Sequence, residues 1–166
     1  MDYLKQLQLE LSSVLADLRK IETTHAAADK WSPDQILEHL YLTYKGTNKG
    51  LARCMASETP AATRSTLKQR VGVFVLLRVG YFPKGRKSPE RAVPRGLSPE
   101  DVRAAILNEL KTMDGSLGDA ERKLGSGIKI MDHPILGPLT AEQWRKFHWV
   151  HGRHHFRQIR ERMGQR

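Results

Sequence analysis

Hydrophobic side chains recur at steps of three and four along four stretches of the chain. This spacing places them on one face of a helix, which is the pattern of an amphipathic helix packed against a core. The first stretch comprises Leu4, Leu7, Leu11, Val14, Leu18 and Ile21. The second follows SPDQ at residues 32–35, where Ser32 can cap the helix, Pro33 suits its first position and Gln35 completes a capping box. Its apolar surface comes from Ile36, Leu37, Leu40 and Leu51.

Two further helix starts follow later in the chain. SPED at residues 98–101 opens the third helix, which ends at GSG, residues 125–127. Its stripe comprises Val102, Ile106, Leu110, Met113, Leu117, Ala120 and Leu124. TAEQ at residues 140–143 is a capping box that opens a final helix reaching to about Met163. This helix runs through Trp144, Phe147, His151, His154, His155 and Ile159.

Roughly forty residues separate the second and third helices. Ser65 to Phe82 could form a fifth, shorter helix, whereas Pro83 to Leu97 holds Pro83, Pro89 and Pro94 among its basic residues and is expected to be an extended loop. No clear strand pattern and no internal repeat is present. The predicted fold is all-α: a four-helix bundle, forming one domain over residues 1–166, with a long basic connection between its second and third helices. Because the four stripes are complete without Pro83 to Arg95, we expect that segment to be separable from the fold.

Composition supports a globular chain with a sizeable core. The sequence has 166 residues, of which 39% are hydrophobic and 28% charged. Cys54 is the single cysteine, so no internal disulfide can form, as in proteins of a reducing compartment. The longest apolar run, Val71 to Phe82, is short and broken by Arg78, and no signal peptide opens the chain. These features predict a cytoplasmic protein with no membrane span.

Positive charge is concentrated in two segments of a chain whose net charge is +10. Arg64 to Arg95 has nine basic residues and one acidic residue, and Trp144 to Arg166 has seven basic residues and one acidic residue. Such asymmetry is typical either of a solvated basic surface or of a surface that binds an anionic partner such as nucleic acid. We favour the solvated surface, since no nucleic-acid-binding motif accompanies the charge.

Four of the seven histidines lie in HWVHGRHHFRQ, residues 148–158. His151 and His155 are four residues apart, so their side chains share one helix face and could bind one metal ion. His154 lies about 100° from His155 around the helix axis and is expected at the surface. Gln158 falls on the His151 face, where it could hold a ligand or a bound water. The i,i+3 pairs of His148 with His151 and of His151 with His154 are alternatives.

A third ligand is needed to make a metal site convincing. His39 is flanked by Ile36 and Leu40, which places it on the apolar side of the second helix. It is either a core histidine with a hydrogen-bond partner or a ligand facing the late pair across the bundle. His25 stands in a connection with no comparable context. His133 precedes the last helix, and a role in shaping that loop is expected.

Three segments, WSPDQILEHL, HPILGPLTAEQW and HGRHHFRQI, resemble the DinB-like superfamily of small helical metalloproteins. The resemblance extends over the whole chain. It implies an up-down-down-up four-helix bundle that holds a divalent ion on His39, His151 and His155, and it implies a homodimer, as in many members. The basic insertion from Arg64 to Arg95 departs from the shorter connection common in the family.

A three-histidine site leaves coordination positions open, as catalytic ions require. Nickel, zinc, iron(II) or manganese would all fit nitrogen ligands. The peptidase motif H-E-x-x-H is absent, because Gly152 and Arg153 follow His151, and Glu38 projects about 100° away from His39. For some members the resemblance implies transfer of a low-molecular-weight thiol onto an electrophile, and for others hydrolysis or isomerisation.

Two functional hypotheses follow, and neither assigns catalytic residues beyond the metal ligands. The first is a divalent-metal-dependent enzyme, preferably a thiol S-transferase acting on a small electrophile, whose basic loop would bind the carboxylates of a thiol cofactor. The second is a non-catalytic helical binding module whose basic surface, including Lys84, Arg86 and Lys87, binds nucleic acid or another anion. The sequence does not name the substrate, the thiol or the metal.

Overall fold

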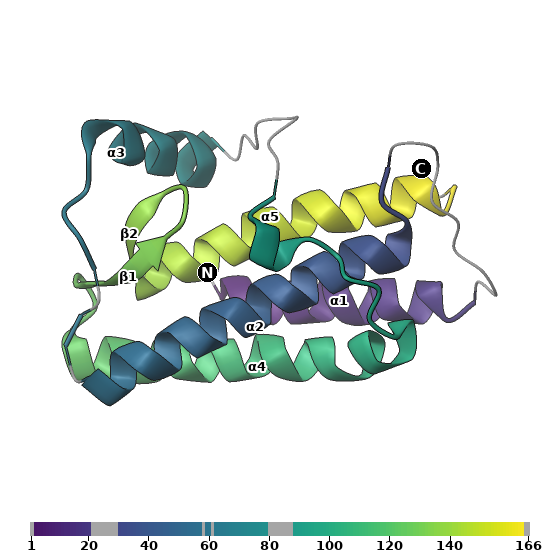
Figure 1. Ribbon diagram of the computed structural model, residues 1–166, viewed down its shortest axis with the longest axis horizontal. Helices are drawn as coiled ribbons and strands as arrows, with labels where there is room; N and C mark the ends of the chain where they lie inside the picture. Colours follow the sequence, from purple (N-terminus) through teal and green to yellow (C-terminus); the bar gives the residue numbers. More distant parts are fainter. Residues whose placement is uncertain (1, 21–29, 58, 61, 80–87, 165–166) are drawn as a thin grey trace.

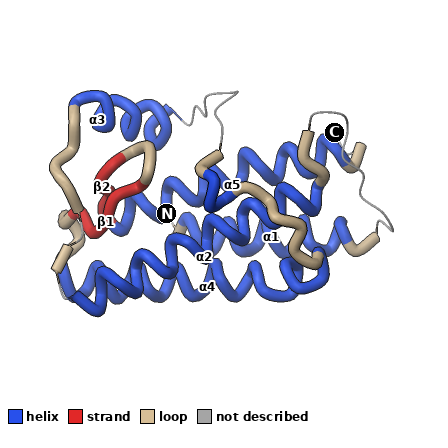
Figure 2. The backbone as a smooth tube through the Cα atoms, in the orientation of Figure 1, coloured by secondary structure: helices blue, strands red, loops and turns tan. Residues whose placement is uncertain are grey.

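Four long helices dominate the computed structural model, which describes residues 2–20, 30–57, 59–60, 62–79 and 88–164 (Figures 1 and 2). They are α1 (Tyr3–Leu18), α2 (Pro33–Ser57), α4 (Pro99–Leu124) and α5 (Ala141–Arg162). The shorter elements are helix α3 (Leu67–Phe74), the π-helical turn η1 (Val75–Val79), the 3-10 turn η2 (Glu90–Ala92) and the strands β1 (Lys129–His133) and β2 (Gly137–Thr140).

The long helices form two parallel pairs that run in opposite directions. Figure 1 shows α1 and α5 running one way and α2 and α4 the other, so the order is up-down-down-up. Helix α2 packs on α4, and α1 packs on α5. Because α2 and α4 are parallel, the chain must return along the bundle between them, which explains the long connection. The predicted helical bundle, with a short extra helix in that connection, is confirmed.

The predicted stripes form one continuous core. The exposed fraction of Leu4, Leu7 and Leu11 on α1 is 0%, and Ile36 and Leu40 on α2 are equally buried. Predicted stripe residues that are also buried in this core are Val14, Leu18, Leu37, Leu51, Val102, Ile106, Leu110, Met113, Leu117, Ala120, Trp144, Phe147 and Ile159. Ile21 lies outside the described residues. The periodicity therefore identified the buried face of each long helix correctly.

Two capping boxes fix where the histidine-bearing helices begin. At α2, the Gln35 N–H donates to Ser32 Oγ (3.2 Å), and the Ser32 N–H donates to Gln35 Oε1 (2.8 Å). At α5, Thr140 and Gln143 exchange the same pair of bonds at 3.2 and 3.1 Å. Each box satisfies N–H groups that have no partner inside the helix. Both predicted starts are confirmed.

A two-stranded hairpin is the element that the hydrophobic pattern does not predict. Strands β1 and β2 pair antiparallel, with Asp132 opposite Pro138 and His133 opposite Gly137. Both strands are too short to show an alternating pattern, and Gly137 and Pro138 argue against a strand. Gly137 has a φ of 70°, which a glycine adopts without strain. The hairpin covers one end of the bundle with buried Ile130 and Leu139.

Among the described helices, none combines the length and the apolar composition that a membrane span needs.

Candidate metal centre

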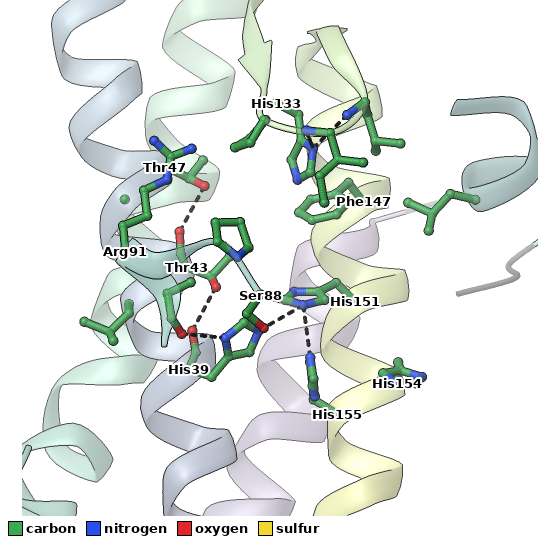
Figure 3. Close-up of a pocket in the computed structure, with 18 of the residues that line it drawn as sticks. His39, Thr43, Thr47, Ser88, Arg91, His133, Phe147, His151, His154 and His155 are labelled. Atoms are coloured by element: carbon green, nitrogen blue, oxygen red, sulfur yellow. Dashed lines mark hydrogen bonds between the residues drawn. The ribbon is translucent and has the colours of Figure 1, made fainter. Parts of the chain in front are cut away.

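Three buried histidines from two helices meet inside the bundle (Figure 3). His39 comes from α2, and His151 and His155 come from successive turns of α5. His151 Nε2 lies 3.2 Å from His39 Nε2 and 3.0 Å from His155 Nε2. One ring nitrogen from each residue lies within 4.8 Å of the others. The structure thus brings together the three residues that the sequence nominates as ligands.

The long connection sets the tautomer of His39. Nδ1 of this ring lies 2.7 Å from the carbonyl oxygen of Ala92 in η2. A carbonyl oxygen can only accept, so Nδ1 carries the hydrogen of the neutral ring. Nε2 therefore presents a lone pair toward the cluster, which is the form that a metal ligand requires.

Gln158 sets the tautomer of His155 in the same way. His155 Nδ1 lies 2.8 Å from Gln158 Oε1, so the ring N–H donates to the amide oxygen and Nε2 keeps its lone pair. The amide nitrogen of Gln158 lies 3.2 Å from His154 Nε2. His154 lies beside the cluster without belonging to it, as predicted, but it is half-buried and not fully at the surface.

The two fixed tautomers leave an imbalance that a cation would resolve. His39 Nε2 and His155 Nε2 are both acceptors, and both face the single Nε2 of His151. His151 Nε2 can donate at most one proton, and only to one of these two atoms. In the other contact, which is also near 3 Å, two lone pairs therefore face each other. Ions bound at about 2.0–2.1 Å hold neighbouring ligand atoms about 3.0–3.4 Å apart. The donor set and its spacing therefore fit a divalent ion.

Burial keeps the cluster neutral. It lowers the pKa of His39, although the hydrogen bond to Ala92 opposes this. Burial and then the charges of His155 and His39 lower the pKa of His151 well below its ordinary value. Burial, with a smaller effect of His39, lowers the pKa of His155 to about 3. Neutral imidazole is the form that binds metals, so near neutral pH no proton competes strongly for the site.

Glu38 anchors the connection instead of serving as a base. Its two carboxylate oxygens accept the backbone N–H groups of Arg95 (2.6 Å) and Gly96 (3.2 Å), and the residue is buried. Ala92 is buried too, and its carbonyl holds His39. The expectation that Pro83 to Arg95 is separable from the fold is therefore wrong for its last part, which belongs to the core and the site.

The remaining histidines have other partners. His148 is fully buried, and its Nε2 lies 3.2 Å from Thr47 Oγ1, so neither alternative i,i+3 pair forms the cluster. His133 Nδ1 accepts the backbone N–H groups of Ile135 and Leu136, which confirms its predicted part in shaping the loop. His25 lies outside the described residues.

A pocket of about 2020 Å³ opens onto the cluster. Its walls come from α2, the α3–η1 segment, η2, the hairpin and α5. Apolar lining includes Trp31, Leu76 and Phe147. Among the described residues, the charged ones that line it are Lys30, Arg53, Lys68, Arg91, Arg157, Arg162, Asp132 and Glu161. The sequence nominated the three clustered histidines and allowed that His133 lines the same end of the bundle, but it gave no sign that Arg91 shares this pocket with them.

Replacing Gln158 tests whether the tautomer of His155 matters. Gln158→Ala is expected to weaken metal binding about 10–100-fold, because the ring loses the acceptor that orients it. Gln158→Glu should stay close to wild type, since a carboxylate also accepts the Nδ1–H. His154→Ala is the matched control and should keep wild-type affinity. Competition with a fluorescent chelator measures all three. Wild-type affinity in Gln158→Ala would show that the amide does not orient the ligand.

Comparison with known proteins places the chain in one family. No curated protein and no solved structure shows significant similarity to it. A family model described as "Protein of unknown function (DUF1569)" matches residues 1–162, a range that contains all three clustered histidines. The chain therefore belongs to the DUF1569 family.

Proposed function

We propose that this DUF1569 protein is a divalent-metal-dependent enzyme whose ion is held by His39, His151 and His155. One observation carries the proposal: three Nε2 atoms converge, and protein acceptors already fix two of the rings with their lone pairs toward the common point. The buried cluster is also consistent with the metal sites of the DinB-like proteins that the sequence resembles. Ala92 and Gln158 orient the ligands in this scheme.

The donor set suggests the role of the ion and leaves its identity open. An ion bound by three neutral imidazoles keeps its full charge and lowers the pKa of a thiol or water at its open positions. Nickel, zinc, iron(II) and manganese all accept nitrogen ligands. Among the described residues, the metal-ligating group contains no carboxylate, and Glu38 is occupied by backbone N–H groups.

We favour thiol S-transfer as the reaction, because it needs no carboxylate base beside the ion. The thiol sulfur forms a bond to an electrophilic carbon, the leaving group departs with its bonding electrons, and the thiol proton passes to solvent. The apolar wall formed by Trp31, Leu76 and Phe147 would receive the electrophile and keep water from it. The histidines hold the ion, and the pocket brings the two substrates together.

Elemental analysis and a transfer assay test this function. Protein purified without a histidine tag should hold about one equivalent of one divalent metal per chain. Loaded with that metal, it should accelerate the substitution of chloride in a chlorodinitrobenzene by the sulfur of N-acetylcysteine, measured by the absorbance of the thioether. His151→Ala should not accelerate it. Stoichiometric metal with no thiol consumption would refute S-transfer, and ester hydrolysis would then favour a hydrolase.

The same protein can be tested as a nucleic-acid-binding module. Absence of metal, together with salt-dependent binding of an oligonucleotide, would replace the enzyme proposal with this alternative. Charge reversal at Lys84, Arg86 and Lys87 should then abolish binding. These three residues lie outside the described part of the chain.

A further inference from the structure

The hairpin side of the pocket carries a hydrogen-bond donor that the proposed function does not use. His133 Nδ1 accepts the N–H groups of Ile135 (3.2 Å) and Leu136 (3.1 Å). Nδ1 must therefore be unprotonated, and in the neutral ring Nε2 carries the hydrogen. Among the described residues no hydrogen-bond partner accompanies Nε2. His133 is thus built as a neutral N–H donor in the pocket lining.

The position of His133 connects it to the metal centre. Its ring lies 4.3 Å from Phe147, centroid to centroid, and Phe147 stacks on His151 at 5.3 Å with an interplanar angle of 14°. Figure 3 shows His133 at the hairpin, with Phe147 between it and His151. His133 and the histidine cluster therefore line the same pocket on either side of Phe147.

Arg91 supplies positive charge from the other wall. It lies in η2, next to Ala92, and Figure 3 draws its side chain extended toward the hairpin end of the pocket. Within the described part of the chain, its guanidinium has neither an ion pair nor a hydrogen bond. Burial, and after it the charge of Arg91, lowers the pKa of His133 to about 4, so Arg91 acts electrostatically on His133 across the pocket.

Among the described residues, neither acidic residue of the lining forms an ion pair with Arg91. Both carboxylate oxygens of Asp132 accept from Thr63, at 3.0 Å from its N–H and 2.7 Å from its hydroxyl. Glu161 lies 4.0 Å from Arg157, at the far end of the site on α5. The Arg91 guanidinium and the His133 N–H therefore remain available to an anion.

We propose that the pocket binds a small molecule bearing an oxyanion, a carboxylate or a phosphate, which Arg91 and the Nε2–H of His133 hold while another group of the molecule reaches the three-histidine centre. The inference rests on the proposed function and names the substrate class of the same site. Arg91 contributes charge, and His133 contributes a directional hydrogen bond. The recessed position of His133, above Phe147, favours a small molecule over a nucleic-acid backbone.

Calorimetric titration of the metal-loaded protein tests this anion subsite, with inorganic phosphate and glutarate as probes. Arg91→Gln and His133→Asn should each weaken binding of the preferred probe about 10–100-fold, the usual effect of losing a hydrogen bond to a charged group. Arg70→Gln, which removes the same charge from an exposed position on α3 outside the pocket, should leave binding unchanged. Preference for phosphate indicates a phosphate ester, and preference for glutarate indicates a carboxylate.

Two substitutions of His133 separate binding from loop folding. In His133→Asn, the side-chain oxygen can still accept the two loop N–H groups, whereas the Nε2 donor is gone. We expect weakened anion binding and a Tm lowered only by the lost ring contact with Phe147. In His133→Gln, an amide N–H takes the place of Nε2 but the loop acceptor is lost. Since both variants lose the ring, we expect a lower Tm than in His133→Asn and an anion affinity closer to wild type.

Repeating the titrations on metal-free protein removes direct binding of the anion to the ion. The dependence on Arg91 and His133 should persist there. Failure of wild type to bind either probe, or wild-type affinity in both Arg91→Gln and His133→Asn, would overturn the anion subsite. Metal content measured on the same samples keeps the two proposals apart, because absent metal contradicts the metal centre and not the anion subsite.

Discussion

His151→Ala is expected to abolish stoichiometric metal binding and to remove the stabilisation that the metal gives to the fold. His151 Nε2 is the atom closest to both other ligands, at 3.2 Å from His39 and 3.0 Å from His155. An ion bound only by the folded state stabilises it by RT ln(1 + [M]/Kd), which is about 4 kcal/mol when free metal is about 1,000 times Kd. The difference in Tm with and without a chelator measures this contribution.

His39→Ala should remove the same metal-dependent increment from a different helix. If the ion joins α2 to α5, the double variant His39→Ala/His151→Ala should lose little more than either single variant, because the two ligands act as one unit. His154→Ala is the control and should respond to a chelator as wild type does. Full metal content in His39→Ala would make His39 a core histidine and would refute the three-histidine centre.

Acidification should unfold the metal-free protein well above the pH at which most carboxylates titrate. Burial is the main cause that lowers the pKa of His148 to about 3 and of His133 to about 4. Histidines in the unfolded chain titrate near 6.5. Between pH 6.5 and these lower values the unfolded chain binds more protons than the folded protein, so the free energy of unfolding decreases as the pH is lowered. Above pH 6.5 the folded protein has the full stability that these neutral histidines allow. Each such histidine costs up to about 1.4 kcal/mol per pH unit below pH 6.5.

The pH dependence of unfolding by urea measures this effect. His148→Phe should flatten the slope by up to about 1.4 kcal/mol per pH unit, because the unfolded chain then has one histidine fewer to protonate. The Thr47 hydroxyl still donates to the Thr43 carbonyl (3.1 Å), so the substitution leaves no donor unpaired there. A free energy of unfolding that stays constant from pH 7 to pH 5 would contradict this account.

The parts of the site that local sequence determines could be predicted. Capping boxes fix the start of α2 and α5, and from each start the 3.6-residue period dictates which histidines face the core. That reasoning places His39, His151 and His155 inward, His154 aside and Gln158 next to His155, as the structure does. These predictions succeed because each depends on spacing within one helix.

The partners supplied by distant, irregular segments could not be predicted. The carbonyl of Ala92 that orients His39 belongs to a short turn, and any residue type there would offer the same oxygen. Arg91 follows from the path of the connection, which no periodicity describes. The role of His133 in the pocket depends on a hairpin too short, and too rich in glycine and proline, to show an alternating pattern.

The order of the helices sets when the proposed metal centre can be completed. Two of the three candidate ligands lie on α5, which follows every other described element, and the third lies 112 residues before His151. While the ribosome is still producing α4, the nascent chain offers a single histidine of the set, which cannot compete for scarce metal. If the three histidines hold an ion, the site is complete only after α5 has been synthesised and has packed against α1.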